Sequence, residues 1–438
     1  MSRWPYLYAA CALAACDERG SDPAAHDTSP GVEVDANPDM SADPGADIAD
    51  EHAGLSWEQV ALGCALMGAG ETEHVMCQHG HSLSLRGDPL YERWLYLRDH
   101  GLEAPTDADL MTIGPVPGTD AVLPPPLTLI LRARLGERVR LRVVSYGPQF
   151  HTFHVHGHLW LDGDTLADTQ TLGPAEVYDQ AEFFAGGGAE DASERAGVGD
   201  WMMHCHVEMH MATGMWGTFR VEPEDGSEAL DANGRFPYEV PAPLGGPGET
   251  VDVYVAAAEV PIAVGRAYFS ALGQLTDVER EARLYIPFAS EAEWTAATAA
   301  SVRQAMATRK QDWTPWVLSL RLGTTVRVHL KNLMKEAPVS LHPHGVRYTA
   351  DEDGTMPEDV VRPGGAPVVM TWTADTAGTW PLHDHARTLE NLARGLFAAI
   401  VVQSPDDEAR IARNYVVFMH DYDMDWLMGA EQPTGAAH

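Results

Sequence analysis

The chain has 438 residues and a formal net charge of −35. Residues 17–54 hold eleven acidic side chains against the single Arg19, so this segment accounts for −10 and leaves −25 for the rest of the chain. A body this acidic argues against a nucleic-acid partner and is compatible with cationic or metal-ion substrates.

The N-terminus has the pattern of an export signal. Residues 1–15 carry the basic Arg3 and then an apolar run that is too short to span a bilayer. The run ends in Leu13-Ala-Ala-Cys16, which resembles a bacterial lipoprotein signal box. We therefore expect cleavage before Cys16, acylation of its thiol, and anchoring in the bacterial cell envelope, on the periplasmic side or the outer surface. The alternative is an unstructured apolar N-terminus.

Residues 16–54 are rich in Asp, Pro, Ala and Gly and contain no Phe, Trp or Tyr. Such a segment cannot bury enough apolar surface to fold, so we expect a disordered acidic tether. Among the other cysteines, Cys11 belongs to the signal, and Cys64 and Cys77 have two possible states. They form a disulfide, which an exported protein permits, or they are separate buried thiols.

An internal repeat organises the rest of the chain. Residues 127–144 and 316–330 both alternate apolar and polar side chains about a glycine turn, the pattern of half-buried antiparallel strands. A histidine-rich segment follows each of them, and each repeat closes with Gly-x-Trp and then His-x-His. We expect two related β-domains at 55–222 and 251–405, a linker rich in Pro, Gly and Glu at 223–250, and a C-terminal strand and tail at 406–438.

The stretch around Cys205 indicates a copper site. His210 follows Cys205 five residues later, and Met215 follows five after that. A thiolate, an imidazole and a thioether are three of the four ligands of a blue-copper centre, whose trigonal plane needs one more imidazole. His204 and His206 project to the opposite face of the strand from Cys205 and can hold other metal ions.

Four His-x-His pairs occupy matched places in the two repeats. In a strand both histidines of such a pair project to one face, so each pair can grip a metal without distorting the backbone. A single pair is most often a pair of ordinary surface or core histidines, but packing does not explain four in matched places. Eight imidazoles converging between two domains suit a cluster of three coppers. The pairs are His154/His156, His204/His206, His342/His344 and His383/His385.

On these motifs the chain resembles the multicopper oxidases over roughly residues 120–405, and its repeats look most like the trinuclear-cluster domains of the ceruloplasmin-like ferroxidases. The resemblance implies an all-β fold of two cupredoxin-like Greek-key β-sandwich domains. It also implies four coppers per chain: one type 1, one type 2 and two type 3. The implied ligands are His151, Cys205, His210 and Met215 for type 1, His154 and His342 for type 2, and His156, His204, His206, His344, His383 and His385 for the type 3 pair.

The order of the motifs departs from that of the larger oxidases. The blue-copper motif comes in the first domain, and His342-Pro-His344-Gly comes in the second. This order resembles that of the two-domain members of the family, which form trimeric rings with each cluster shared between neighbouring chains. We therefore expect a homotrimer. The alternative is a monomer in which the two repeats face each other directly.

The resemblance implies an oxidase that takes single electrons from Cu(I), Fe(II) or a phenol at the type 1 copper and reduces dioxygen to water with four electrons at the cluster. Met215 as axial ligand implies a moderate type 1 potential, which suits easily oxidised donors. We expect an imidazole edge of His210 or His151 to be exposed to the reductant. Asp353 and Glu208 resemble in placement the proton-relay carboxylates of the family, and orienting metal-bound imidazoles is an equally good role for them.

Two other functions would use only part of this set. A copper nitrite reductase also has two domains with its type 1 copper in the first, but it needs only three imidazoles at its second copper, and its Cys is not followed immediately by His. A non-enzymatic copper carrier or electron-transfer protein would use the type 1 site alone. Both leave the second-domain histidines without a role, so the sequence favours the oxidase.

Four further segments are interpreted more simply. The methionines near the copper motif, Met202, Met203, Met209 and Met211, are expected to fill a core, with Cu(I) binding as the alternative. Cys77-Gln-His79-Gly-His81 is expected to be a loop or a strand end.

An Ala-rich stretch at 291–306 predicts an inserted helix. Residues 415–426 predict a strand and then a solvated acidic end, and the alternative is that Asp421, Asp423 and Asp425 collect metal ions there.

Overall fold

The fold is described by a computed structural model, and all described residues lie in the compact unit Leu55–His438. The predicted signal and tether at 1–54, Cys64, Cys77 and the acidic tail after residue 421 lie outside the described part. Main chain alone is described at 81–83, 208–209 and 268–269. Within the described part, no helix combines the length and the apolar character needed to cross a membrane. The described residues are 81–83, 88–106, 109–110, 112–124, 127–147, 149–187, 197–225, 239–269, 272–311 and 313–421.

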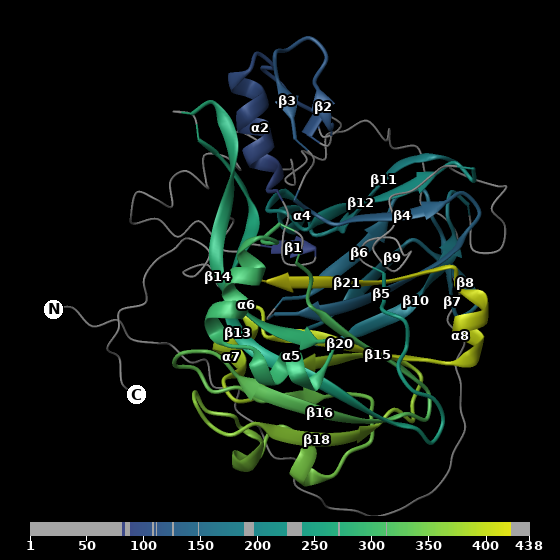
Figure 1. The fold of residues 1–438 in the computed structure, drawn as a ribbon. Helices are drawn as coiled ribbons and strands as arrows, with labels where there is room; N and C mark the ends of the chain where they lie inside the picture. Colours follow the sequence, from purple (N-terminus) through teal and green to yellow (C-terminus); the bar gives the residue numbers. More distant parts are fainter. Residues whose placement is uncertain are drawn as a thin grey trace, which may run out of the picture. The chain divides into compact units, whose positions relative to one another are not determined.

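The first repeat is a β-sandwich of a five-stranded sheet, β4-β12-β11-β6-β9, and a four-stranded sheet, β1-β21-β5-β10 (Figure 1). Leu131, Leu141, Phe153 and Phe219 from the two sheets meet in one buried apolar cluster, which removes their surface from water. The strands are β1 His81–Leu83, β4 Ile130–Arg134, β5 Arg138–Tyr146, β6 His151–Val155, β9 Thr169–Leu172, β10 Val177–Phe184, β11 Gly199–Cys205, β12 Trp216–Glu222 and β21 Arg413–Asp421.

The second repeat is a β-sandwich of two four-stranded sheets, β14-β13-β16-β18 and β15-β20-β19-β17. Its core includes Leu318, Val328, Trp372 and Ile400. The all-β prediction of two sandwich domains is therefore confirmed. The strands are β13 Thr250–Phe269, β14 Gln274–Phe288, β15 Trp316–Arg321, β16 Thr325–Asn332, β17 His342–Pro343, β18 Val368–Thr373, β19 Gly378–His383 and β20 Phe397–Gln403.

The strands predicted from the repeat are present, but their pairing is partly parallel. β4 runs parallel to β12 and β5 parallel to β21, while β15 runs parallel to β20 and β16 parallel to β13. The expectation of antiparallel strands was therefore wrong for these pairs. The reason is that the glycine turn after β4 or β15 carries the chain from one sheet to the other, so each strand pairs with a strand distant in sequence.

Strand β21 joins the first repeat, although it follows the second in sequence. It lies between β1 and β5 in one sheet (Figure 1, yellow). The buried Arg142 of β5 donates to Asn414 Oδ1 at 2.7 Å and to Thr379 Oγ1 at 2.9 Å, so it links β5, β21 and β19. The hydroxyl of Tyr146 also bridges the repeats, donating to the Ala398 carbonyl at 2.7 Å.

Shorter elements surround the sandwiches. The predicted helix at 291–306 is present as two helices, α5 and α6, because the chain breaks at Ala297 and the Thr298 side chain caps the second helix. The remaining bounds are α2 Leu90–Asp99, α4 Glu208–Ala212, α5 Glu291–Ala296, α6 Ala299–Ala307, α7 Thr388–Leu392, α8 Pro405–Arg410, η3 Ala350–Glu352, η4 Pro357–Asp359, β2 Gly114–Pro115, β3 Val122–Leu123, β7 Trp160–Asp162 and β8 Thr165–Ala167.

Candidate metal centres

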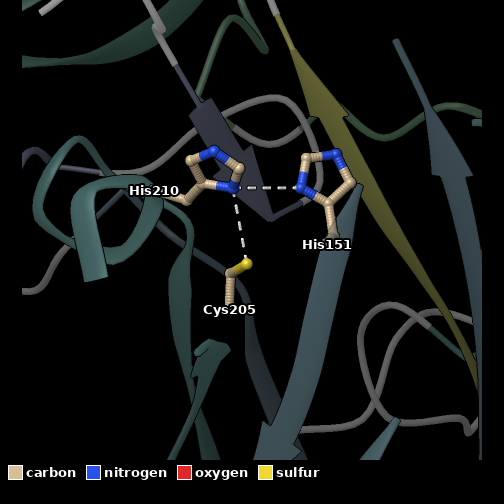
Figure 2. Close-up of side chains that lie close together, drawn as sticks. All are labelled: His151, Cys205 and His210. Carbon is tan, nitrogen blue, oxygen red and sulfur yellow. Dashed lines mark hydrogen bonds between the residues drawn. The ribbon is translucent and has the colours of Figure 1, made fainter. Parts of the chain in front are cut away.

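Three predicted type 1 ligands meet inside the first sandwich, and we call His151, Cys205 and His210 the type 1 trio. His151 begins β6, Cys205 ends the neighbouring strand β11, and His210 lies in α4 directly after it. Figure 2 shows the two imidazoles facing each other beside the sulfur. His210 Nδ1 lies 3.3 Å from His151 Nδ1 and 3.5 Å from Cys205 Sγ. The trio offers two nitrogens and one sulfur to a single ion.

Met215 belongs to the same buried cluster as Cys205. Its main chain is tied to the trio, because Cys205 N–H donates to the Met215 carbonyl at 3.0 Å and Met215 N–H donates to the His210 carbonyl at 2.8 Å. Burial raises the pKa of the Cys205 thiol to about 11, against hydrogen bonds from the Thr152 and Val207 main chains. A bound cation is therefore needed to hold Cys205 as a thiolate at neutral pH.

Both histidines of the trio are covered, contrary to the expectation of an exposed imidazole edge. His151 is 0% exposed and His210 is 3% exposed. Gln149 Oε1 lies 2.9 Å from His210 Nε2, and Asp421 Oδ1 lies 3.6 Å from His151 Nε2. The expectation that Asp421 belongs to a solvated acidic end was also wrong, because this residue is 4% exposed and ends β21 beside the trio.

The first repeat also holds four clustered histidines, which we call the first quartet: His154, His156, His204 and His206. The ligand nitrogens of His154, His156 and His204 lie within 4.8 Å of one another. His156 Nε2 and His204 Nε2 are 3.1 Å apart. The exposed His206 completes the group, with its ring 5.3 Å from that of His204 and 5.5 Å from that of His154.

The second repeat holds an equivalent group, the second quartet of His342, His344, His383 and His385. The ligand nitrogens of His342, His344 and His383 again lie within 4.8 Å of one another, and His344 Nε2 is 3.1 Å from His383 Nε2. The ring of the exposed His385 lies 5.2 Å from that of His342. The repetition in sequence is thus also a repetition in geometry.

Hydrogen bonds turn half of these imidazoles inward. In four of them Nδ1 meets a main-chain carbonyl, and because a carbonyl only accepts, the proton lies on Nδ1 and the Nε2 lone pair faces its quartet. Burial lowers the pKa of His204, His344 and His383 to about 4, so these rings are neutral at neutral pH and able to ligate. Both quartets therefore fit metal ions. The four bonds are His154 to Asp168 (2.8 Å), His204 to Cys205 (2.9 Å), His342 to Asp353 (2.7 Å) and His383 to Asp384 (3.0 Å).

A glycine–tryptophan contact supports each quartet from behind. Gly157 follows His-x-His with φ +72°, and a Cβ there would lie 2.7 Å from the Trp201 ring. Gly345 has φ +66°, and a Cβ there would lie 1.9 Å from the Trp380 ring. The glycines turn the chain after each pair and let the indoles pack against the backbone.

The two quartets do not meet within one chain. Among these eight described histidines, each ring contact and hydrogen bond between two of them joins members of the same quartet. His204 and His383 are buried, while His156, His206 and His385 are exposed. Each quartet therefore has a side open to a further set of ligands.

The second repeat has no counterpart of the type 1 trio among its described residues. Asp384 stands between His383 and His385 where Cys205 stands in the first repeat. Its buried carboxylate accepts from Ser340 N–H and Arg387 N–H at 2.8 Å and from Asn391 Nδ2 at 2.9 Å. This position holds the loop through hydrogen bonds instead of holding a metal.

Of the two predicted proton-relay residues, the structure describes the side chain of Asp353 but not that of Glu208. Asp353 Oδ1 lies 3.3 Å from His342 Nδ1, and its carbonyl accepts from the same nitrogen. Burial alone would raise the pKa of Asp353, but the hydrogen bond from Thr355 and the electrostatic effect of the neighbouring His342 bring it below its usual value. Asp353 thus orients His342 and is ionised. Glu208 lies in α4, and its side chain is outside the described part.

Sequence reasoning missed two supporting residues, Asp168 and Gln149. The Asp168 carbonyl accepts from His154 Nδ1, just as the Asp353 carbonyl accepts from His342 Nδ1. A closer alignment of the two repeats would have identified Asp168. Gln149 has no such signal, because its role depends on how the loop before β6 folds.

The methionines near the motif pack as expected where they are described. Met203 lies in the core with Cys205, and Met202 and Met211 pack against the cluster around Trp94 of α2. The Met209 side chain is outside the described part.

Comparison with known families agrees with this geometry. Two family models, both described as multicopper oxidase, match residues 102–225 and 291–407. The chain belongs to the multicopper oxidase family. Membership implies a copper-binding oxidoreductase, which the clustered histidines and cysteine of this multicopper oxidase fit.

Individual relatives match short parts of the chain. A probable nitrite reductase-hydroxylamine oxidoreductase fusion protein of Kuenenia stuttgartiensis is 41% identical over 93 residues, which are 21% of this chain and 10% of that protein. Human hephaestin is 31% identical over 105 residues, 19% of this chain and 9% of hephaestin. The matches thus span about a tenth of these relatives. A solved laccase of Pediococcus acidilactici Pa5930 is 20% identical with a TM-score of 0.26, over 42% of this chain and 32% of that one.

Proposed function

We propose that this multicopper oxidase couples one-electron oxidation of a small reductant to four-electron reduction of dioxygen to water. The observation that carries the proposal is that the chain holds both quartets in addition to the type 1 trio, with Nε2 lone pairs turned inward in each quartet. Four coppers per chain would occupy these sites: type 1 on the trio with Met215, type 2 on His154 and His342, and type 3 on the other six histidines.

Bound copper would supply reversible one-electron chemistry at the trio and multi-electron reduction of oxygen at the quartets. The chain itself connects the two places. Cys205 belongs to the trio, and its sequence neighbours His204 and His206 belong to the first quartet, so a short covalent path joins them. Asp353 would hold His342 in place and pass protons through water to the second quartet.

The separation of the quartets supports a shared cluster. Three coppers need both sets of imidazoles, yet within one chain the quartets make no mutual contact among their described side chains. We propose a homotrimer in which the first quartet of one chain faces the second quartet of its neighbour. A closed ring would complete three equivalent sites, whereas an isolated chain would complete none.

The reductant would donate electrons without touching either trio imidazole, since both are buried. The half-buried Gln149 covers His210, and the adjacent Phe150 is 57% exposed. Cu(I), Fe(II) and phenols are the proposed donors. We further propose that the enzyme acts at the bacterial cell envelope, anchored through acylated Cys16.

The first test is copper content together with oxygen consumption of the reconstituted protein without its lipid tether. We expect four coppers per chain, a blue absorption band and water as the product. The double substitution His344→Ala with His385→Ala should abolish oxygen uptake and keep the blue colour. Full uptake by this variant would refute the oxidase.

The main competing function is nitrite reduction, which the printed name of the Kuenenia relative raises. A nitrite reductase would bind about two coppers per chain and release nitric oxide from nitrite under reducing, oxygen-free conditions. A copper carrier would bind about one copper and turn over neither oxygen nor nitrite. We expect neither pattern, because both leave the second quartet without a role.

Sharing of the cluster between chains is tested by mixing two inactive variants. One carries His156→Ala and His206→Ala, and the other carries His344→Ala and His385→Ala. After joint unfolding and refolding with copper, shared clusters should restore part of the oxygen uptake, because some interfaces then pair two intact quartets. Clusters formed within single chains would restore none, and that result would overturn the trimer.

A further inference from the structure

One carboxylate reaches both histidines of the type 1 trio. Asp421 Oδ1 lies 3.6 Å from His151 Nε2, and Asp421 Oδ2 accepts from Gln149 N–H at 3.1 Å. The side chain of that same Gln149 places Oε1 2.9 Å from His210 Nε2. Asp421 therefore contacts one imidazole directly and the other through Gln149, in each case at the nitrogen that points away from the trio.

The surrounding fold fixes the carboxylate in this place. Strand β21 runs parallel to β5 with His420 opposite Tyr146, so Asp421 arrives beside the loop that leads from β5 to β6. Gly147 begins this loop with φ +99°, and a Cβ there would lie 2.8 Å from Asp421 Oδ2. Only glycine lets the loop pack so closely on the carboxylate. Asp421 is 4% exposed, so little water screens its charge.

We propose that Asp421 is a positioning residue of the type 1 centre, which orients His210 through Gln149 and lowers the reduction potential of the bound copper through its charge beside His151. The reduction potential of the copper is lowered because an anion buried beside the ligands stabilises the oxidised ion, which carries one more positive charge than the reduced ion. At 3.6 Å the carboxylate is too far from His151 for a hydrogen bond, so it acts on this ring through its field. The inference rests on the proposed function only in that the trio holds a type 1 copper.

The geometry also defines how the C-terminal strand and the copper site depend on each other. The trio comes from β6, β11 and α4, whereas the carboxylate beside His151 Nε2 belongs to Asp421. That charge comes from β21, more than two hundred residues later in the chain. Through Asp421, strand β21 therefore supplies a charge beside the type 1 trio of the first repeat.

The test compares Asp421→Asn with Asp407→Asn in the copper-loaded, full-length protein. Asp407 is also buried, at 8% exposed, but it pairs with Arg140 and does not contact the trio. The readouts are copper per chain, the blue absorption band, the type 1 electron paramagnetic resonance signal and the reduction potential. We expect Asp421→Asn to keep its copper, to raise the potential and to change the resonance signal, because an amide cannot supply the negative charge. Asp407→Asn should match the parent in potential and signal.

A second variant, Gln149→Ala, tests the indirect contact without changing any charge. Gln149 is half-buried in a loop, so its truncation leaves the β-sheets intact. We expect a changed resonance signal, because His210 loses the acceptor for its Nε2 proton. The double variant with Asp421→Asn should change the signal by less than the sum of the single variants, since the two residues act on His210 in series. If Asp421→Asn does not fold, the resonance signal of Gln149→Ala alone tests the inference.

Two results would overturn the inference: an unchanged potential and signal in Asp421→Asn, or an unchanged signal in Gln149→Ala. Failure of the proposed function looks different, because the parent protein itself would then lack the blue band and the type 1 signal.

Discussion

Replacement of Gly345 by alanine should damage the second quartet through a single contact. Gly345 follows His344 directly and has φ +66°, and a Cβ there would lie 1.9 Å from Cδ2 of Trp380. The left-handed backbone costs alanine about 1–2 kcal/mol. Overpacking against the indole adds about 1–3 kcal/mol, because this half-buried ring packs against the core of the second repeat. We expect the free energy of unfolding to fall by about 2–5 kcal/mol in total.

The matched control for this substitution is Gly364→Ala. Gly364 has φ +70°, nearly the same backbone conformation, but no atom lies within 4 Å of the position of its Cβ. This variant should lose only the backbone part, about 1–2 kcal/mol. Chemical denaturation of the copper-free proteins measures both values, and the difference between them isolates the contact with Trp380.

The copper-loaded proteins give an independent readout. Displacement of Trp380 or of the turn moves His344, so Gly345→Ala should bind fewer coppers than the parent while its blue band keeps full intensity. Equal unfolding free energies for Gly345→Ala and Gly364→Ala, with full copper content in both, would refute the steric argument.

Three further predictions concern the junction of the repeats and the buried histidines. Tyr146→Phe removes a buried hydroxyl that bonds main-chain groups of β19 and β20, and thermal denaturation should show a loss of about 1–3 kcal/mol. Arg142→Met removes the hydrogen bonds that the buried guanidinium donates to Asn414 and Thr379 and should cost about 1–3 kcal/mol, with no change in the blue band. The copper-free protein should lose stability as the pH falls from about 6.5 to about 4, because burial lowers the pKa of His383 to about 4 and the unfolded chain binds the proton more strongly. Stability that stays constant across this pH range would contradict that assignment.

The sequence predicted those parts of the site that repeat locally. Each His-x-His pair lies at the end of one strand, so its spacing alone places both rings in one quartet, and the match between the repeats excludes coincidence. Cys205 and His210 are likewise close in sequence, separated only by the turn into α4. Contacts between residues this close in sequence do not depend on how the sheets are arranged.

Contacts between distant segments could not be predicted in the same way. The parallel pairing of β5 with β21 joins residues about 270 positions apart, and no periodicity in either strand specifies its partner. The burial of Asp421 follows from that pairing, as does the contact of Gln149 with the trio. For the same reason the expected exposure of His210 was wrong, since the residues that cover it come from another part of the chain.

The position of β21 also determines the order in which the protein can be built. A ribosome makes residues 127–222 long before residues 413–421, so the first sandwich emerges while one edge of β5 still lacks its neighbour. An unpaired strand edge is a site for mispairing with other chains. The second sandwich must therefore be synthesised before the first can close, and the blue-copper pocket is complete only once residues 413–421 have been made. We expect copper loading to require residues 413–421, and nascent chains stopped before residue 413 to aggregate.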